Sequence, residues 1–164
     1  MAEDVDRPLS LAVEVNPIRH DRSGLTGRTI LTSGERIRAF ISSTLNELVE
    51  ERLVAREAIT SLRLEPVYFG DGARPLPPPA IYREQLRKCP IFVGIYWNDY
   101  GQPVDGLDIS GIEDEYNRSA GKDKLIYIKQ PSDDRDDRLT VLLNRIRDEG
   151  QVSYVKFSST DVTP

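Results

Sequence analysis

The pattern of hydrophobic and polar positions changes character near residue 35. Before it, residues 1–34 contain one short alternating stretch, "LAVEV", among segments such as "NPIRHDRSGLTG" that are rich in turn-forming residues. After it, apolar runs of strand length alternate regularly with longer segments of helical period. We therefore expect an N-terminal extension or linker over 1–34, an α/β domain over 35–158, and a C-terminal tail over 159–164.

Five segments of the regular part read as strands and four as helices. The expected strands are 36–42, 64–69, 90–97, 124–129 and 152–157, and the expected helices are 44–62, 80–89, a segment starting at Ser110, and 136–150. The third strand is apolar almost throughout, which is typical of a central parallel strand buried on both faces. This alternation predicts a three-layer α/β sandwich with a parallel sheet. Without a GxGxxG turn, the flavodoxin-like strand order 2-1-3-4-5 is favoured.

The chain runs only a few residues past the fifth predicted strand, where a flavodoxin-like fold normally adds a closing helix. Either the N-terminal segment covers that face of the sheet, or the domain belongs to a longer protein. We favour the second explanation, in which the tail leads into further sequence.

Composition narrows the class of partner. Charged residues make up 30% of the 164 residues, hydrophobic residues 38%, and the formal net charge is −5, without basic runs. This balance argues against a nucleic-acid or anionic-membrane surface. No apolar run approaches the ~20 residues that a membrane-spanning helix needs. The lone cysteine excludes an internal disulfide framework. We expect a cytoplasmic domain with neither nucleic-acid nor membrane partners.

Four loops should meet at one edge of the sheet. The loops after parallel strands lie together at the carboxyl edge, where ligands bind, and here they are 42–44, 70–79, 97–110 and 130–132. The turn Ser42-Ser43-Thr44 could hold a phosphate at the start of the next helix, or its residues could simply cap that helix. Arg74 could likewise meet a phosphate or only solvent.

Several common chemistries are missing. The chain has no G-x-x-x-x-G-K-[ST] segment, which excludes a P-loop ATPase within this domain. Its only histidine, His20, lies in the irregular N-terminal part, so a Ser-His-Asp or Cys-His mechanism lacks a base. One cysteine and one histidine cannot form a structural zinc site, and we expect no metal.

Two carboxylates stand near the start of the third predicted helix, in the stretch "DISGIEDEYNRSAGK". Ser110 and Glu113 have the S-x-x-E spacing of a capping box, which would tie off the helix end. The same Glu113 could instead be a catalytic carboxylate that faces a ligand. Glu115 lies two positions further on. The residues alone leave both interpretations open.

Four ordered motifs resemble a known family. "FISSTLNELVEER", "GARPLPPP", "VGIYWNDYG" and "SGIEDEY…GKDKLIYIK" are similar to a Toll/interleukin-receptor-like (TIR-like) domain of uncharacterised function, often found N-terminal to NACHT- and other STAND-type ATPases. The resemblance covers residues 36–157. It implies a STAND or NACHT ATPase C-terminal to this domain in the same protein, and self-association.

The resemblance also implies a catalytic residue, because this family is related to TIR domains and nucleoside deoxyribosyltransferases. In the latter, a reactive glutamate starts a helix that leads to a Gly-Lys pair and the next strand. Glu113 keeps a closely similar spacing to Gly121-Lys122, and Glu115 is the fallback. The W-C-x-x-E pattern of many NAD-cleaving TIR domains is missing, and Cys89-Pro90 stands where related chains often carry an acidic residue.

One glutamate would suffice for the implied chemistry. Cleavage of the bond between nicotinamide and ribose in NAD needs a carboxylate beneath the developing oxocarbenium ion, but no histidine, metal or added cofactor. Aromatic residues could stack on a base or nicotinamide ring, and the full set of expected ligand-binding residues is Ser42, Ser43, Thr44, Arg74, Tyr96, Trp97, Tyr100 and Tyr116.

Three functional hypotheses follow from this pattern. The first is an effector or signalling domain that cleaves the N-glycosidic bond of NAD or a related nucleotide. The second is a non-catalytic domain for self-association or docking within a STAND-type ATPase. The third is a flavin or nucleotide binder that uses the Ser42-Ser43-Thr44 turn.

Overall fold

The domain is built on a five-stranded parallel sheet. The computed structural model describes residues 36–69, 79–150 and 152–158. The strands are β1 (Arg38–Ser42), β2 (Glu65–Val67), β3 (Ile91–Tyr96), β4 (Asp123–Lys129) and β5 (Ser153–Phe157). Their order is β2-β1-β3-β4-β5, with every neighbouring pair parallel. The predicted flavodoxin-like sheet is confirmed. The predicted boundary near residue 34 lies outside the described residues.

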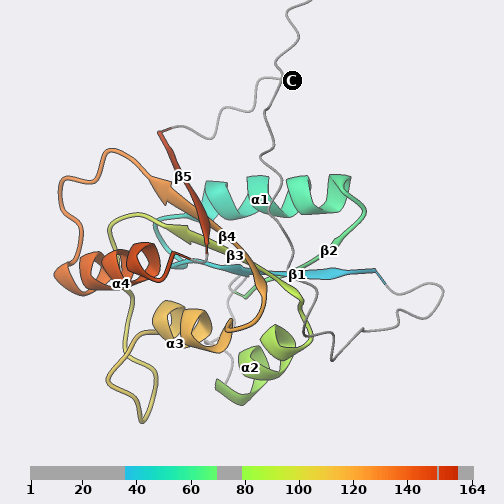
Figure 1. Ribbon diagram of the computed structural model, residues 1–164, viewed down its shortest axis with the longest axis horizontal. Coiled ribbons are helices and arrows are strands. Elements are labelled where there is room, and N and C mark those ends of the chain that lie inside the picture. The colour runs from blue at the N-terminus through green and yellow to red at the C-terminus, as the bar shows by residue number, and fades with distance from the viewer. Residues whose placement is uncertain (1–35, 70–78, 151, 159–164) are drawn as a thin grey trace, which may run out of the picture. The chain divides into compact units, whose positions relative to one another are not determined.

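Helices cover both faces of this sheet and form the outer layers of the predicted sandwich. They are α1 (Val49–Ser61), α2 (Pro79–Arg87), α3 (Gly111–Arg118) and α4 (Asp137–Asp148). Figure 1 shows α1 on one face and α2, α3 and α4 on the other. Among the described residues, every helix is too short or too polar to cross a bilayer.

The core forms two layers because side chains of a strand alternate between the faces of a sheet. Toward α2, α3 and α4 the buried cluster includes Phe40, Phe92 and Ile126, while toward α1 it includes Ile41 and Val93. Five of the six residues of β3 are buried. This strand therefore holds the centre of the sheet, as its apolar sequence predicts.

The first helix starts later than predicted. Its first residue is Val49 rather than a residue next to Thr44. The Thr44 hydroxyl donates to the Glu47 carboxylate over 2.9 Å, and the same carboxylate accepts from the backbone N–H of Asp99, also over 2.9 Å. Glu47 thus ties the loop after β1 to the loop after β3 instead of capping α1.

A buried arginine fixes the same loop. The Arg52 guanidinium donates to the backbone carbonyls of Thr44 and Leu45 over 2.7 and 2.9 Å. Its neighbour Glu51 forms an ion pair with Lys129 of β4. Two buried charges of α1 therefore hold the backbone around the carboxyl edge in place.

Candidate functional site

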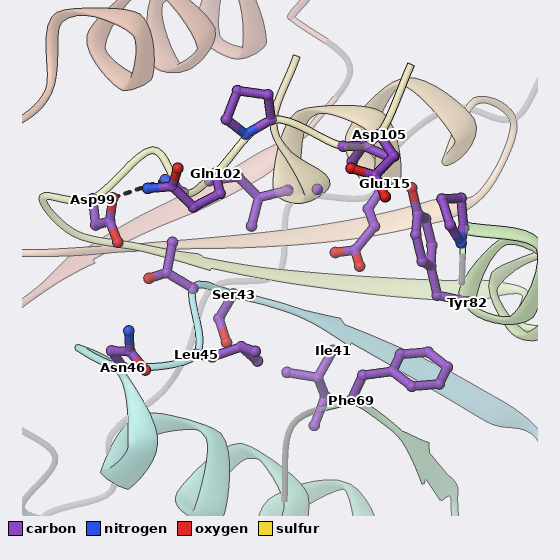
Figure 2. A pocket seen from close by; sticks show the side chains of 17 residues that line it. Ile41, Ser43, Leu45, Asn46, Phe69, Tyr82, Asp99, Gln102, Asp105 and Glu115 are labelled. Carbon is purple, nitrogen blue, oxygen red and sulfur yellow. Dashed lines mark hydrogen bonds between the residues drawn. The ribbon is translucent and has the colours of Figure 1, made fainter. Parts of the chain in front are cut away.

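A pocket of about 530 Å³ opens at the carboxyl edge of the sheet, where the topology places ligand sites. Its walls come from the loop after β1, the loop after β3, the first turn of α3, and Tyr82 of α2 (Figure 2). Ser43 and Thr44, two of the expected ligand-binding residues, line it, and their contact with a ligand stays a prediction. The apolar part of the lining consists of Ile41, Leu45, Phe69, Pro79, Pro103, Val104 and Ile112.

The carboxyl group of Glu115 projects into this pocket. Figure 2 shows it pointing from α3 toward the middle of the cavity, between Tyr82 and Gln102. Burial raises the pKa of Glu115 from its ordinary 4.5 to about 8, with the nearby Ser42 hydroxyl acting in the opposite direction and the charge of Asp114 adding to the rise. In the empty pocket at pH 7, this carboxyl is therefore mostly neutral.

Two buried hydroxyls surround the Glu115 carboxyl behind the pocket lining. Ser42 and Tyr96 are each 1% exposed, and neither lines the pocket. Ser42 pairs in register with Gly94, which needs its small size because a Cβ there would lie 2.7 Å from the Tyr96 hydroxyl. Against the larger effect of burial, the Ser42 hydroxyl acts to lower the pKa of Glu115, while burial, followed by the charge of Glu115, raises the pKa of Tyr96.

A buried carboxylate positions the wall formed by α2. Asp114 accepts a hydrogen bond from the Tyr82 hydroxyl over 2.6 Å and ion-pairs with Arg83 and Arg118 over 2.9 and 3.0 Å. Burial, followed by the hydrogen bond and charge of Asp114, raises the pKa of Tyr82 to about 12. Burial opposes ionisation of Asp114, but its three donors prevail and hold its pKa below the usual value. The sequence analysis did not single out Asp114, although its i,i+4 spacing from Arg118 was a readable signal.

Glu113 lies outside the pocket lining. Its carboxylate accepts a hydrogen bond from the Tyr100 hydroxyl and forms an ion pair with Arg145 of α4 over 3.1 Å. The predicted capping box does not form, because the Ser110 side chain makes no cap hydrogen bond. The Tyr100 hydroxyl instead accepts from the Ser110 backbone N–H over 3.3 Å and so links it to Glu113. Whether Glu113 is catalytic stays a prediction.

The remaining aromatic candidates also face other parts of the fold. The Trp97 indole N–H donates to a backbone carbonyl in the loop after β4, and the Lys129 ammonium lies 4.1 Å from its ring. Tyr116 is buried, and its hydroxyl donates to Glu149 over 2.5 Å. Neither lines the pocket. Arg74 lies outside the described residues.

The serine-rich turn lacks the helix start that the phosphate interpretation requires. Anions bind at helix N-termini because free backbone N–H groups point outward there. The helix α1 begins five residues after Thr44, and the Thr44 hydroxyl is already bonded to Glu47. Ser43 and Thr44 therefore contribute to the pocket wall without a helix dipole behind them.

The described lining is acidic. It contains the carboxyl groups of Asp99, Asp105 and Glu115, and no lysine, arginine or histidine among the residues that the structure describes. Within those same residues, no three acidic, cysteine or histidine side chains gather closely enough to hold a metal ion. Within the described residues, the ionisable side chains of the lining are therefore these three carboxyl groups and Tyr82.

Fold and site together define a flavodoxin-like α/β domain with an acidic ligand pocket at its carboxyl edge. The chain belongs to the family DUF4062, a domain of unknown function, which matches residues 38–160. None of the curated proteins compared with the chain matches it. A similar solved structure is that of a diflavin flavoprotein A3 from Nostoc sp., with 15% identity and a TM-score of 0.43, covering 76% of this chain and 79% of that one. The TIR-like resemblance and the ATPase partner stay predictions.

Proposed function

We propose that this domain cleaves the N-glycosidic bond of NAD or a related nucleotide, with Glu115 as the catalytic carboxylate. The observation that supports this most is the placement of the Glu115 carboxyl inside the pocket, while Glu113 is engaged by Tyr100 and Arg145. Glu115, the second candidate from the sequence, therefore takes the catalytic role in this proposal in place of Glu113.

The chemistry requires Glu115 to be ionised. The bond between C1′ of the ribose and the ring nitrogen breaks, and its electron pair neutralises the pyridinium ring as nicotinamide leaves. The carboxylate stabilises the positive charge that develops at C1′, or bonds to it. Water then adds its oxygen to C1′ and releases a proton. Because burial raises the Glu115 pKa to about 8, kcat/KM should rise with pH through that region.

The pocket walls support this assignment. The ring of Tyr82 lines the cavity, and its hydroxyl is fixed by Asp114, so it offers a rigid aromatic wall to a planar leaving group. The Ser43 hydroxyl, which lines the pocket and is unpartnered within the described residues, is suited to a hydrogen bond with a ribose hydroxyl. Trp97, the stacking platform considered from the sequence, has no part in this arrangement.

The test is nicotinamide release from NAD at high protein concentration by the parent, Glu115→Gln and Glu113→Gln. The two variants carry the same chemical change on one helix, two residues apart. Loss of release in Glu115→Gln alone, with the folded fraction unchanged by circular dichroism, supports the proposal. Loss in Glu113→Gln alone returns the catalytic role to Glu113. No release from NAD by the full chain, with or without a crowding agent, counts against NAD as the substrate.

A second function, docking of another protein segment, is favoured by the face of the sheet that carries α1. Leu125, Tyr127 and Val155 are 42, 36 and 50% exposed and lie together on this face, where β4 pairs with β5. Exposed apolar strips of this kind mark interaction surfaces. Sedimentation of the parent and of Tyr127→Asp over a range of concentrations tests it. Association that the substitution abolishes supports docking by self-association, and identical monomeric behaviour opposes it.

A further inference from the structure

We propose that the pocket selects N-glycosides that have a cationic leaving ring and no phosphate, such as nicotinamide riboside, over the dinucleotide NAD. This inference deepens the proposed function and rests on it. It specifies a substrate whose leaving ring carries a positive charge and whose ribose carries no phosphate.

The charge of the described lining favours a cation over an anion. Asp99 and Asp105 come from the loop after β3 and Glu115 from α3, and no described lining residue carries a positive charge. Proteins bind phosphate through arginine, lysine or helix N-termini. An anion that enters a pocket without such partners loses its hydration and gains no interaction that offsets this cost. A pyrophosphate placed here would face carboxylates, whereas a pyridinium ring would be attracted.

Three cationic side chains near the pocket are already engaged by other groups. Arg83 and Arg118 are held by Asp114. Arg52 binds the backbone carbonyls of the loop after β1. Recruiting any of these to a phosphate would break buried interactions that shape the pocket.

The ionisation of Glu115 is coupled to the charge of the ligand, because its carboxyl projects into the pocket. The groups that face it are Ser42, Tyr96, Tyr82 and Asp114, together with the pocket carboxyls named above. Both tyrosines have raised pKa values and remain neutral at pH 7. A cationic ring therefore finds in Glu115 a buried carboxyl that can ionise in response, releasing a proton. A neutral or anionic ligand gains nothing from this ionisation.

The size and polarity of the pocket also favour a riboside. A pocket of about 530 Å³ lies within the range of roughly 300–1,000 Å³ that holds a drug-sized ligand, which suits a nucleoside. The Ser43 hydroxyl lines the pocket and is unpartnered within the described residues, so it adds a neutral hydrogen-bonding group. Such a group matches a ribose hydroxyl rather than a phosphate charge.

Turnover of four N-glycosides by the full chain tests the selectivity: nicotinamide riboside, nicotinamide mononucleotide, NAD and inosine. We expect kcat/KM to be highest for the riboside and to fall as phosphate charge is added. Asp105→Asn should lower the riboside-to-NAD ratio about two- to fivefold, as for one partly screened charge. The control Asp148→Asn makes the same change of net charge on an exposed α4 residue outside the lining, and should leave the ratio unchanged.

Binding of 1-methylnicotinamide, a cationic ring without a glycosidic bond, tests the charge coupling apart from catalysis. Calorimetry at pH 7 in two buffers of different ionisation enthalpy should show release of close to one proton. Glu115→Gln should release none, and neutral nicotinamide should cause no release from the parent.

The outcomes separate the two proposals. Faster cleavage of NAD than of the riboside, or cleavage of inosine alone, overturns the charge selectivity and keeps an N-glycosidase. Binding of 1-methylnicotinamide with proton release, but no cleavage of any substrate, overturns the proposed function and keeps the selectivity. Neither binding nor cleavage overturns both.

Discussion

Replacing Glu115 by glutamine should stabilise the domain near pH 8–9 and change its stability little near pH 5. In the folded domain the pKa of this carboxyl is raised from 4.5 to about 8 by burial. Between these values the folded state holds a proton that the unfolded chain has lost. The free energy of unfolding of the parent therefore falls as pH rises across this window, and it is highest below it. Glutamine does not titrate, so the variant escapes this loss.

The magnitude follows from the two pKa values. A difference of one between folded and unfolded pKa values is worth 1.36 kcal/mol, so the full change from 4.5 to about 8 corresponds to roughly 5 kcal/mol as an upper limit. Glu115 borders an open pocket, and entry of water relieves part of the cost of ionisation. We expect glutamine to stabilise the protein by roughly 2–4 kcal/mol at about pH 9.

Urea unfolding at several pH values measures this effect, with the fluorescence of Trp97, the single tryptophan of the chain, as the signal. The difference in unfolding free energy between variant and parent isolates Glu115, because other titrating groups are common to both proteins. Glu113→Gln is the matched control, because it makes the same chemical change two residues away on the same helix and outside the pocket lining. A Glu115→Gln difference that is flat with pH, or a variant less stable than the parent at pH 9, would refute the electrostatic description of the pocket.

Three further changes test the structure around the site. Asp114→Asn should lower the free energy of unfolding by roughly 1–3 kcal/mol, since it weakens a buried acceptor of three donors. In urea titrations this loss should become smaller as pH falls through the lowered pKa of the Asp114 carboxyl. Gly94→Ala should cost roughly 1–3 kcal/mol in thermal unfolding, because the new Cβ meets the Tyr96 hydroxyl at 2.7 Å. Adding Tyr96→Phe should recover part of this loss of stability. Fully additive effects of the two substitutions would contradict this contact. Glu47→Ala should cost roughly 2 kcal/mol of stability and raise KM, because the Glu47 carboxylate joins the two loops that wall the pocket. An unchanged KM with reduced stability would show that Glu47 has only a structural role.

The sheet and its order were predictable because they depend on patterns that span many residues. The apolar run of β3 and the alternation of strands with helices leave few arrangements that bury both faces. The start of α1 was not predictable from the same kind of pattern. Thr44 and Glu47 have the spacing of a capping box, but Glu47 is used by the backbone of Asp99, which lies far away in sequence. Local signals fail where a tertiary partner competes for the same side chain.

The choice between Glu113 and Glu115 shows the same limit at the site itself. The apolar stripe of α3, Ile112 and Tyr116, is buried against the sheet as the periodicity predicts. With about 100° of rotation per residue, Glu113 and Glu115 lie on opposite flanks of that stripe. Hydrophobic periodicity alone does not distinguish one flank from the other. What separates them is which neighbour packs on each side: Arg145 of α4 meets Glu113, while the loops after β1 and β3 leave a cavity in front of Glu115. A motif that contains both glutamates therefore indicates a turn of α3, and the elements that pack beside this turn decide which carboxyl faces the pocket.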